Sequence, residues 1–190
     1  MTFDVTGAAL AGVDEEFVSS GRQDNLNCSY ASVTALAAQS EAPAGGHVSA
    51  VVLFDHEEIG SRSATGADGA WLGRQLERTV LARGGTRDDF LRAVSNSLHV
   101  SADMTHATHP NYPDRHEPGH WIELGGGPVI KVSANVNYGT TAPTQAAFLA
   151  ATEQAGVPVQ YFVNRSGVRT TTRPASPRSR SSQELISGPP

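Results

Sequence analysis

Apolar and polar residues along the chain follow two spacings, one typical of helices and the other of strands. Apolar residues recur at helical spacing in four segments, which predicts helices at 24–39, 70–83, 86–98 and 143–154. Short apolar runs predict strands at 3–6, 48–54, 99–104, 129–133 and 157–163. Because strands and helices alternate, we expect an α/β fold with helices layered on a mixed, mostly parallel sheet.

The boundary between the second and third expected helices carries the clearest local signals. Gly84 and Gly85 end the helix expected at 70–83, since glycine is common just after the last turn of a helix. Thr86 can cap the next helix, and Asp88 and Asp89 put negative charge in its first turn, which the helix dipole favours. We therefore expect a short turn between two helices here.

Acidic residues follow two of the expected strands. Asp55, Glu57 and Glu58 come after the apolar run 48–54, and Asp103 lies near the end of the run 99–104. Ligand sites in open α/β sheets gather at the carboxyl ends of strands. Adjacent carboxylates there repel each other and lose hydration unless a cation or a shared proton offsets the cost. A metal site is the interpretation we favour, and solvated loop acids are the ordinary alternative.

Glu57 and Glu58 are expected to have different roles because an extended backbone points neighbouring side chains to opposite sides. One carboxylate would hold a cation and the other would handle a proton. The pair His56-Glu57 is not the helical zinc motif of two histidines, since Gly60 stands where the second histidine would be.

Further polar residues occur where the pattern would place ligands or substrate contacts. His106 and His109 follow Asp103 at a spacing that can put both imidazoles on one side of a turn, which suits a metal or oxyanion site. A scatter of surface histidines is the alternative. Asp24 opens a helix, where capping is the ordinary role. Lys131 lies in an otherwise apolar strand, which indicates an anionic partner such as a substrate carboxylate.

Composition and charge narrow the class of protein. A chain of 190 residues, 38% of them hydrophobic, is long enough for one domain with a substantial core. Its net charge of -5, with no basic stripe before the C-terminal tail, argues against nucleic acid as a partner. Cys28 is the only cysteine, which excludes an intrachain disulfide and a zinc site built from cysteines.

The two ends of the chain add expectations about location and order. No apolar run approaches the ~20 residues of a membrane span, and the first residues lack a signal-peptide pattern, so we expect a cytoplasmic protein without a membrane partner. Residues 166–190 are rich in Ser, Thr, Arg and Pro, which is typical of a disordered tail. We therefore expect the folded part to be residues 1–165.

Five motifs occur together in the order and approximate spacing of one enzyme family. They are Arg22-Gln23-Asp24-Asn25-Leu26, Asp55-His56-Glu57-Glu58-Ile59-Gly60-Ser61, residues 101–112 with the three-residue string Ala102-Asp103-Met104, Gly127-Pro128-Val129-Ile130-Lys131, and residues 157–166. From about residue 3 to residue 166 the chain closely resembles the aspartyl aminopeptidase family.

The resemblance implies a metal centre and a fold. Its members are exopeptidases with two zinc ions and a layered α/β/α catalytic domain, and they remove N-terminal, typically acidic residues from peptides. By resemblance, Asp24 bridges the two metals, while Asp103 and Glu58 each bind one of them. Glu57 is then the general base that takes a proton from the bridging water.

The resemblance also implies substrate contacts and assembly. His109, together with His106, would stabilise the developing oxyanion or hold the substrate. Lys131 would face the acidic side chain of the substrate. Members of the family assemble into large homo-oligomers from dimers.

The resemblance further implies segments that the chain lacks. In the family, one histidine ligand and a dimerisation domain come before the matched region, and a second histidine ligand comes after it. No histidine follows His120 here. We therefore expect a partial catalytic domain over 1–165, incomplete at both ends. Two hypotheses follow: a metalloaminopeptidase, or a catalytically inactive fragment or gene remnant that lacks both histidine ligands.

Overall fold

The computed structural model describes residues 4–39, 46–134 and 138–165, which form parts of two compact units. Unit 1 comprises Met1–Leu53 with Ala102–Met104, and unit 2 comprises Phe54–Ser101 with Thr105–Pro190. The expected tail at 166–190 lies outside the described residues. No helix in the described ranges is both long and apolar enough to cross a bilayer.

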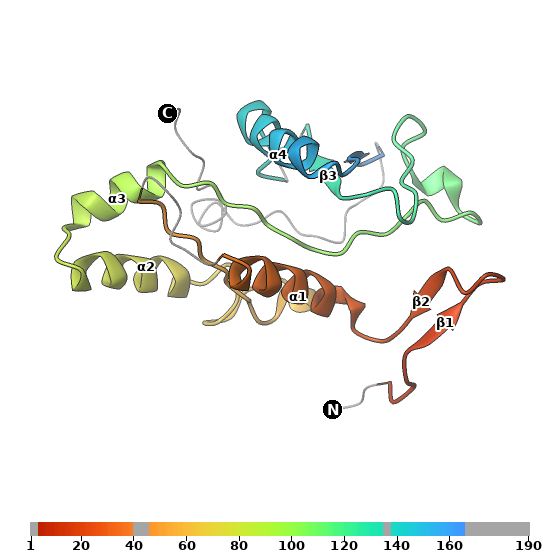
Figure 1. Ribbon diagram of the computed structural model, residues 1–190, viewed down its shortest axis with the longest axis horizontal. Helices are drawn as coiled ribbons and strands as arrows, with labels where there is room; N and C mark the ends of the chain where they lie inside the picture. The colour runs from red at the N-terminus through yellow and green to blue at the C-terminus, as the bar shows by residue number, and fades with distance from the viewer. Residues whose placement is uncertain (1–3, 40–45, 135–137, 166–190) are drawn as a thin grey trace. The chain divides into compact units, whose positions relative to one another are not determined.

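Unit 1 begins with a hairpin that the sequence pattern did not predict. β1 (Ala9–Ala11) pairs antiparallel with β2 (Phe17–Ser19), with Leu10 opposite Val18. The hairpin appears in red and orange in Figure 1. The strand expected at 3–6 was wrong, because the described residues 4–6 have no strand pairing.

The first expected helix is confirmed as α1 (Gln23–Ala37), also in unit 1. The apolar residues on its face are largely exposed: Leu26 is 58%, Tyr30 73% and Val33 49% exposed. The reason is that no other helix or strand in the described part of this unit packs extensively against α1. Helical periodicity thus predicted the element, although none of its residues is buried.

In unit 2, two helices pack against each other across a short turn. α2 (Trp71–Ala82) and α3 (Arg87–Ser95) confirm the helices expected at 70–83 and 86–98, and Figure 1 shows them in yellow-green. Thr86 caps α3 reciprocally: its hydroxyl accepts from the Asp89 N–H at 3.2 Å, and its own N–H donates to the Asp89 carboxylate at 2.8 Å. This capping box is worth about 1 kcal/mol.

The same unit holds a strand–helix–strand element, which confirms the expected α/β class. β3 (Val129–Val132) and β4 (Gln160–Val163) are parallel neighbours, and α4 (Ala142–Ala155) lies between them in sequence. The Gln145 amide donates to the Tyr161 hydroxyl at 2.9 Å and so joins α4 to β4. Parallel strands need a crossover of this kind.

The strands expected at 48–54 and 99–104 were wrong, since neither segment pairs with a strand in the described residues. An apolar run becomes a buried strand only when neighbouring strands satisfy its backbone and cover its side chains. Here Val48 is 90% and Leu53 58% exposed. The apolar pattern indicated a strand, but pairing depends on partners distant in sequence.

Buried apolar side chains are few, contrary to the substantial core that chain length suggested. Among the described residues, only Leu72, Ile122 and Ile130 are buried large hydrophobic residues. Two of them lie in or beside the β3–β4 element. Gln160 also joins this element to the preceding turn: its side-chain oxygen accepts from the Glu123 N–H at 2.9 Å and its amide donates to the Glu123 carbonyl at 3.1 Å.

Candidate metallopeptidase site

Glu57 and Glu58 lie in a one-turn 3₁₀ helix, η1 (Glu57–Ile59), rather than in an extended segment. The expectation that they point to opposite sides of a strand was therefore wrong. With three residues per turn, neighbouring side chains diverge by about a third of a turn. Both glutamates are exposed and still point in different directions, so one can act as a ligand while the other acts as a base.

The turn that carries these glutamates is closed by local hydrogen bonds. His56 adopts φ 64°, and its carbonyl accepts from the Ser61 N–H at 2.8 Å. The His56 imidazole Nδ1 bonds the Ser63 hydroxyl at 2.8 Å. The Gly60 N–H donates to the Glu57 carbonyl at 2.8 Å. Backbone and side-chain bonds therefore set the direction in which the two carboxylates leave the turn.

The other two predicted metal ligands, Asp24 and Asp103, both belong to unit 1. Asp24 lies at a kink near the start of α1 (φ -83°, ψ 117°), and the peptide bond to Asn25 is cis. The residue at the N-cap position is Arg22, so the ordinary capping role does not fall to Asp24. Asp24 and Asp103 are both exposed.

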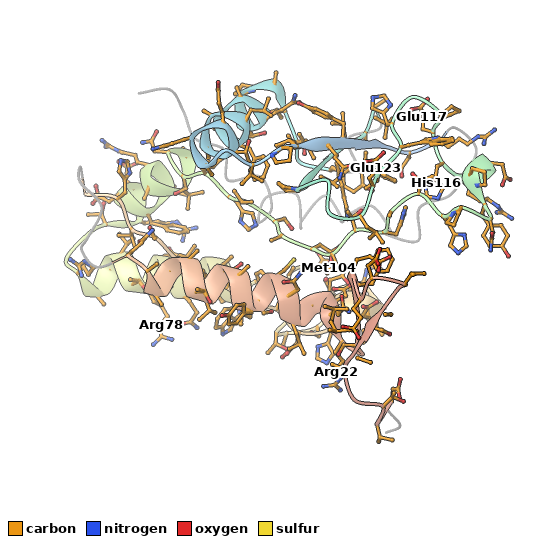
Figure 2. The ribbon with its side chains drawn as sticks, turned by 45° about the vertical axis from the view of Figure 1, so that its right-hand side comes forward. Arg22, Arg78, Met104, His116, Glu117 and Glu123 are labelled. Carbon is orange, nitrogen blue, oxygen red and sulfur yellow. The ribbon has the colours of Figure 1, made fainter. Side chains whose placement is uncertain are left out.

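A contact within unit 1 brings the segments of these two aspartates together. The Asn27 side-chain amide in the first turns of α1 lies 3.5 Å from the Met104 sulfur, although the two residues are 77 positions apart. Met104 is labelled in Figure 2. Asn27 is three positions from Asp24 and Met104 is one position from Asp103, so the two segments meet in this unit.

His106 and His109 lie in a loop of unit 2 that is held at several points. The Thr108 N–H donates to the Ile122 carbonyl, and the Ile122 N–H donates to the Thr108 hydroxyl, each at 2.9 Å. The His109 N–H donates to the imidazole Nε2 of His116 at 3.1 Å, and the His109 Nδ1 accepts from the Asn111 N–H at 3.1 Å. These bonds hold the loop at Thr108 and fix the backbone and the ring of His109.

The loop histidines lie beside the strand element that carries Lys131. Lys131 on β3 is paired in register with Phe162 on β4, so the two side chains share a face of the sheet. The Phe162 ring makes an edge contact with the His106 ring, with centroids 5.6 Å apart. Unit 2 therefore places His106 against Phe162, the residue that shares a face of the sheet with Lys131.

Sequence reasoning missed His116, which contacts both predicted histidines. Its ring centroid is 5.2 Å from that of His106, and its Nε2 accepts from the His109 N–H. Desolvation lowers the pKa of His116 below its ordinary value, and the neighbouring imidazoles of His106 and His109 lower it further. Figure 2 labels His116 beside Glu117. No spacing rule signals His116, because its partners lie in an irregular loop.

The donors of the predicted metal site suit zinc chemically. Asp and Glu oxygens are zinc ligands, although a set of carboxylates is less selective than one with imidazoles. Within the part of the chain that the structure describes, no three His, Cys, Asp or Glu side chains are grouped to hold a metal ion. Asp24 and Asp103 belong to one unit and Glu58 to the other.

Comparison with known proteins identifies relatives along most of the chain. Residues 1–179 match the family described as aminopeptidase I zinc metalloprotease (M18). A probable M18 family aminopeptidase 2 of Mycobacterium tuberculosis is 48% identical over 170 residues, which cover 87% of this chain and 39% of that protein. A relative with the same description from Streptomyces avermitilis is 44% identical over 169 residues, covering 88% of this chain and 39% of the relative.

Solved structures agree with this assignment. The protein in the crystal structure of prApe1 is 28% identical to this chain with a TM-score of 0.82, and the match covers 95% of this chain and 38% of that chain. A chain of the Ape4 and Nbr1 complex is 36% identical with a TM-score of 0.79, covering 93% of this chain and 34% of that chain. The Saccharomyces mApe1 dodecamer is 26% identical with a TM-score of 0.76, covering 95% of this chain and 40% of that chain.

The matched relatives are longer than this chain, which spans about 39% of the length of the curated relatives that it matches. The motifs at Asp24, Glu57–Glu58, Asp103–His109 and Lys131 all fall inside the matched region. With the family matched over residues 1–179 and the fold shared with solved members, the chain belongs to the aminopeptidase I zinc metalloprotease (M18) family.

Proposed function

We propose that the protein is a metalloaminopeptidase that releases N-terminal, preferentially acidic residues from peptides at a two-zinc site. The observation that carries the proposal is the match of residues 1–179, which include every predicted site residue, to the M18 family, together with 48% identity to an M18 aminopeptidase over 170 residues. Zinc would lower the pKa of a bound water and polarise the scissile carbonyl. Asp24 would bridge the two ions, and Glu58 and Asp103 would each hold one.

The remaining predicted residues would act on water and substrate. Glu57 would take the proton from the attacking water, a role that an exposed carboxylate at the start of η1 can serve without leaving its turn. His109 would donate a hydrogen bond to the developing oxyanion, with His106 beside it. Lys131 is half-buried on β3, where a cation can face the carboxylate of an acidic first residue.

Assembly and location complete the proposal. A relative in this family has been solved as a dodecamer, which supports a homo-oligomer as the working form of this protein too. A cytoplasmic location and the absence of nucleic-acid and membrane partners stay predictions of the sequence.

The test of the proposed substrate class is the variant Lys131→Met assayed on Glu-, Asp- and Leu-anilides with zinc. Truncating one partner of a buried charge pair costs roughly 2–5 kcal/mol, so kcat/KM for the acidic substrates should fall by about 30-fold or more. Leu-anilide should change much less, and Lys131→Arg should keep most of the acidic preference. An equal fall for all three substrates would overturn the assignment of Lys131 to the acidic side chain.

A further inference from the structure

Hydrogen bonds determine the tautomers of the histidines in the 105–116 loop. A backbone N–H can only donate, so the bond from the Asn111 N–H to His109 Nδ1, at 3.1 Å, requires that nitrogen to be unprotonated. The neutral His109 ring then carries its proton on Nε2. His109 is therefore set as an Nε2–H donor, the form that an oxyanion requires.

A hydrogen bond also determines the tautomer of His116. Its Nε2 accepts from the His109 N–H at 3.1 Å, so in the neutral ring the proton is on Nδ1. Protonation of His116 would remove this acceptor. Desolvation and the two neighbouring imidazoles lower the pKa of His116, which keeps the ring neutral and able to accept at neutral pH.

His116 also packs against the second histidine of the candidate site. The rings of His106 and His116 meet edge-on, with centroids 5.2 Å apart and an interplanar angle of 71°. Phe162 also contacts His106 edge-on, at 5.6 Å and 83°. Edge-to-face contacts of this kind are favourable and orient the rings. One side chain, His116, therefore bonds the backbone of one predicted site histidine and packs on the ring of the other.

We propose that His116 is a positioning residue, which fixes the ring of His106 and the backbone of His109, whose own ring is an Nε2–H donor. The positioning follows from contacts within unit 2 alone. Only the further step, that this Nε2–H meets an oxyanion, rests on the proposed peptidase function. His116 itself would touch neither the substrate nor a metal ion.

Hydrogen–deuterium exchange at single amides tests the positioning directly. In His116→Leu, the His109 amide should exchange on the order of 10-fold faster, because it loses one hydrogen bond. The Thr108 amide, which donates to the Ile122 carbonyl, should keep its rate and serves as the control in the same molecule. In His116→Gln, the side-chain oxygen can replace Nε2 as acceptor, so the His109 amide should stay protected.

A matched variant separates the bond from a general effect of removing a histidine. His120 follows four residues after His116, but its imidazole bonds the Glu117 carboxylate at 2.5 Å rather than His109. His120→Gln should leave the His109 amide unchanged. Equal acceleration in His116→Leu, His116→Gln and His120→Gln would overturn the proposal, and so would acceleration in none of them. If His116→Leu fails to fold, protection retained in His116→Gln supports the proposal, and protection lost in it overturns the proposal.

Imidazole nitrogen NMR gives a second readout that needs no variant. At pH 7.5 the neutral His109 ring should show a protonated Nε2 and the His116 ring a protonated Nδ1; the reverse tautomer at either residue overturns the proposal. With zinc and peptide, His116→Leu should lower kcat on the order of 10-fold with a smaller change in KM, and His116→Gln should restore it. If the protein hydrolyses no peptide, that result counts against the proposed function alone, because exchange and tautomers still decide the positioning.

Discussion

A methyl group at Gly127 should open the turn that leads into β3. Gly127 adopts φ +91°, and a Cβ there would stand 2.0 Å from the Pro158 carbonyl oxygen. The left-handed backbone alone costs roughly 1–2 kcal/mol for a residue with a side chain. The clash is with backbone, so the turn must move away from Pro158. That movement weakens the pair of bonds between Gln160 and Glu123, each worth about 1 kcal/mol.

Gly127→Ala should therefore destabilise the β3–β4 element by about 3–4 kcal/mol, the sum of the backbone and hydrogen-bond losses. Gly125 is the matched control, because it has φ +75° but nothing within 4 Å of its Cβ position. Gly125→Ala should cost only the backbone part, roughly 1–2 kcal/mol. Amide exchange of residues 129–132 and 160–163 measures both opening free energies. Equal losses in the two variants would refute the close approach to Pro158.

Two further predictions concern helix capping and pH. Thr86→Ala removes the capping box of α3 and should lower the free energy of unfolding by about 1 kcal/mol in urea melts, whereas Thr79→Ala in α2 removes no cap and should cost less. Burial lowers the pKa of His99 from its ordinary 6.5. The neutral His99 side chain therefore contributes fully to the free energy of unfolding above pH 6.5. The contribution falls at lower pH, because the unfolded chain takes up the proton before the folded chain does. His99→Gln should flatten this part of the stability–pH curve, and an unchanged curve would contradict the burial effect.

Local signals predicted the helices well, because a helix closes its hydrogen bonds within its own segment. Thr86 and the aspartates after it predicted the start of α3, and Gly84 predicted the end of α2. The strands were predicted less well. Part of the run 129–133 forms β3 and pairs with β4, whereas the run 48–54 pairs with no strand in the described residues. Periodicity indicates that a run can form a strand, but it does not encode which distant segment pairs with that run.

In the candidate site, too, the sequence predicted some features and missed others. A charged residue in an apolar run, such as Lys131, and acids that follow such a run, such as Glu57 and Glu58, can be recognised in a sequence because a charge at a position expected to be buried needs a reason. The backbone that carries the glutamates was not visible, since their 3₁₀ turn depends on bonds made by His56 and Ser63. His116 was missed because contacts within an irregular loop have no period.

The measurement that tests the central claim most directly is zinc content and peptide hydrolysis measured side by side in Glu57→Gln. If Glu57 is the base and not a ligand, hydrolysis should fall by roughly 10²- to 10⁴-fold while bound zinc stays at the wild-type level. Glu58→Gln, one residue along the same turn, should instead lose zinc together with activity. Loss of zinc in Glu57→Gln, or zinc-dependent hydrolysis that survives it, would contradict the account.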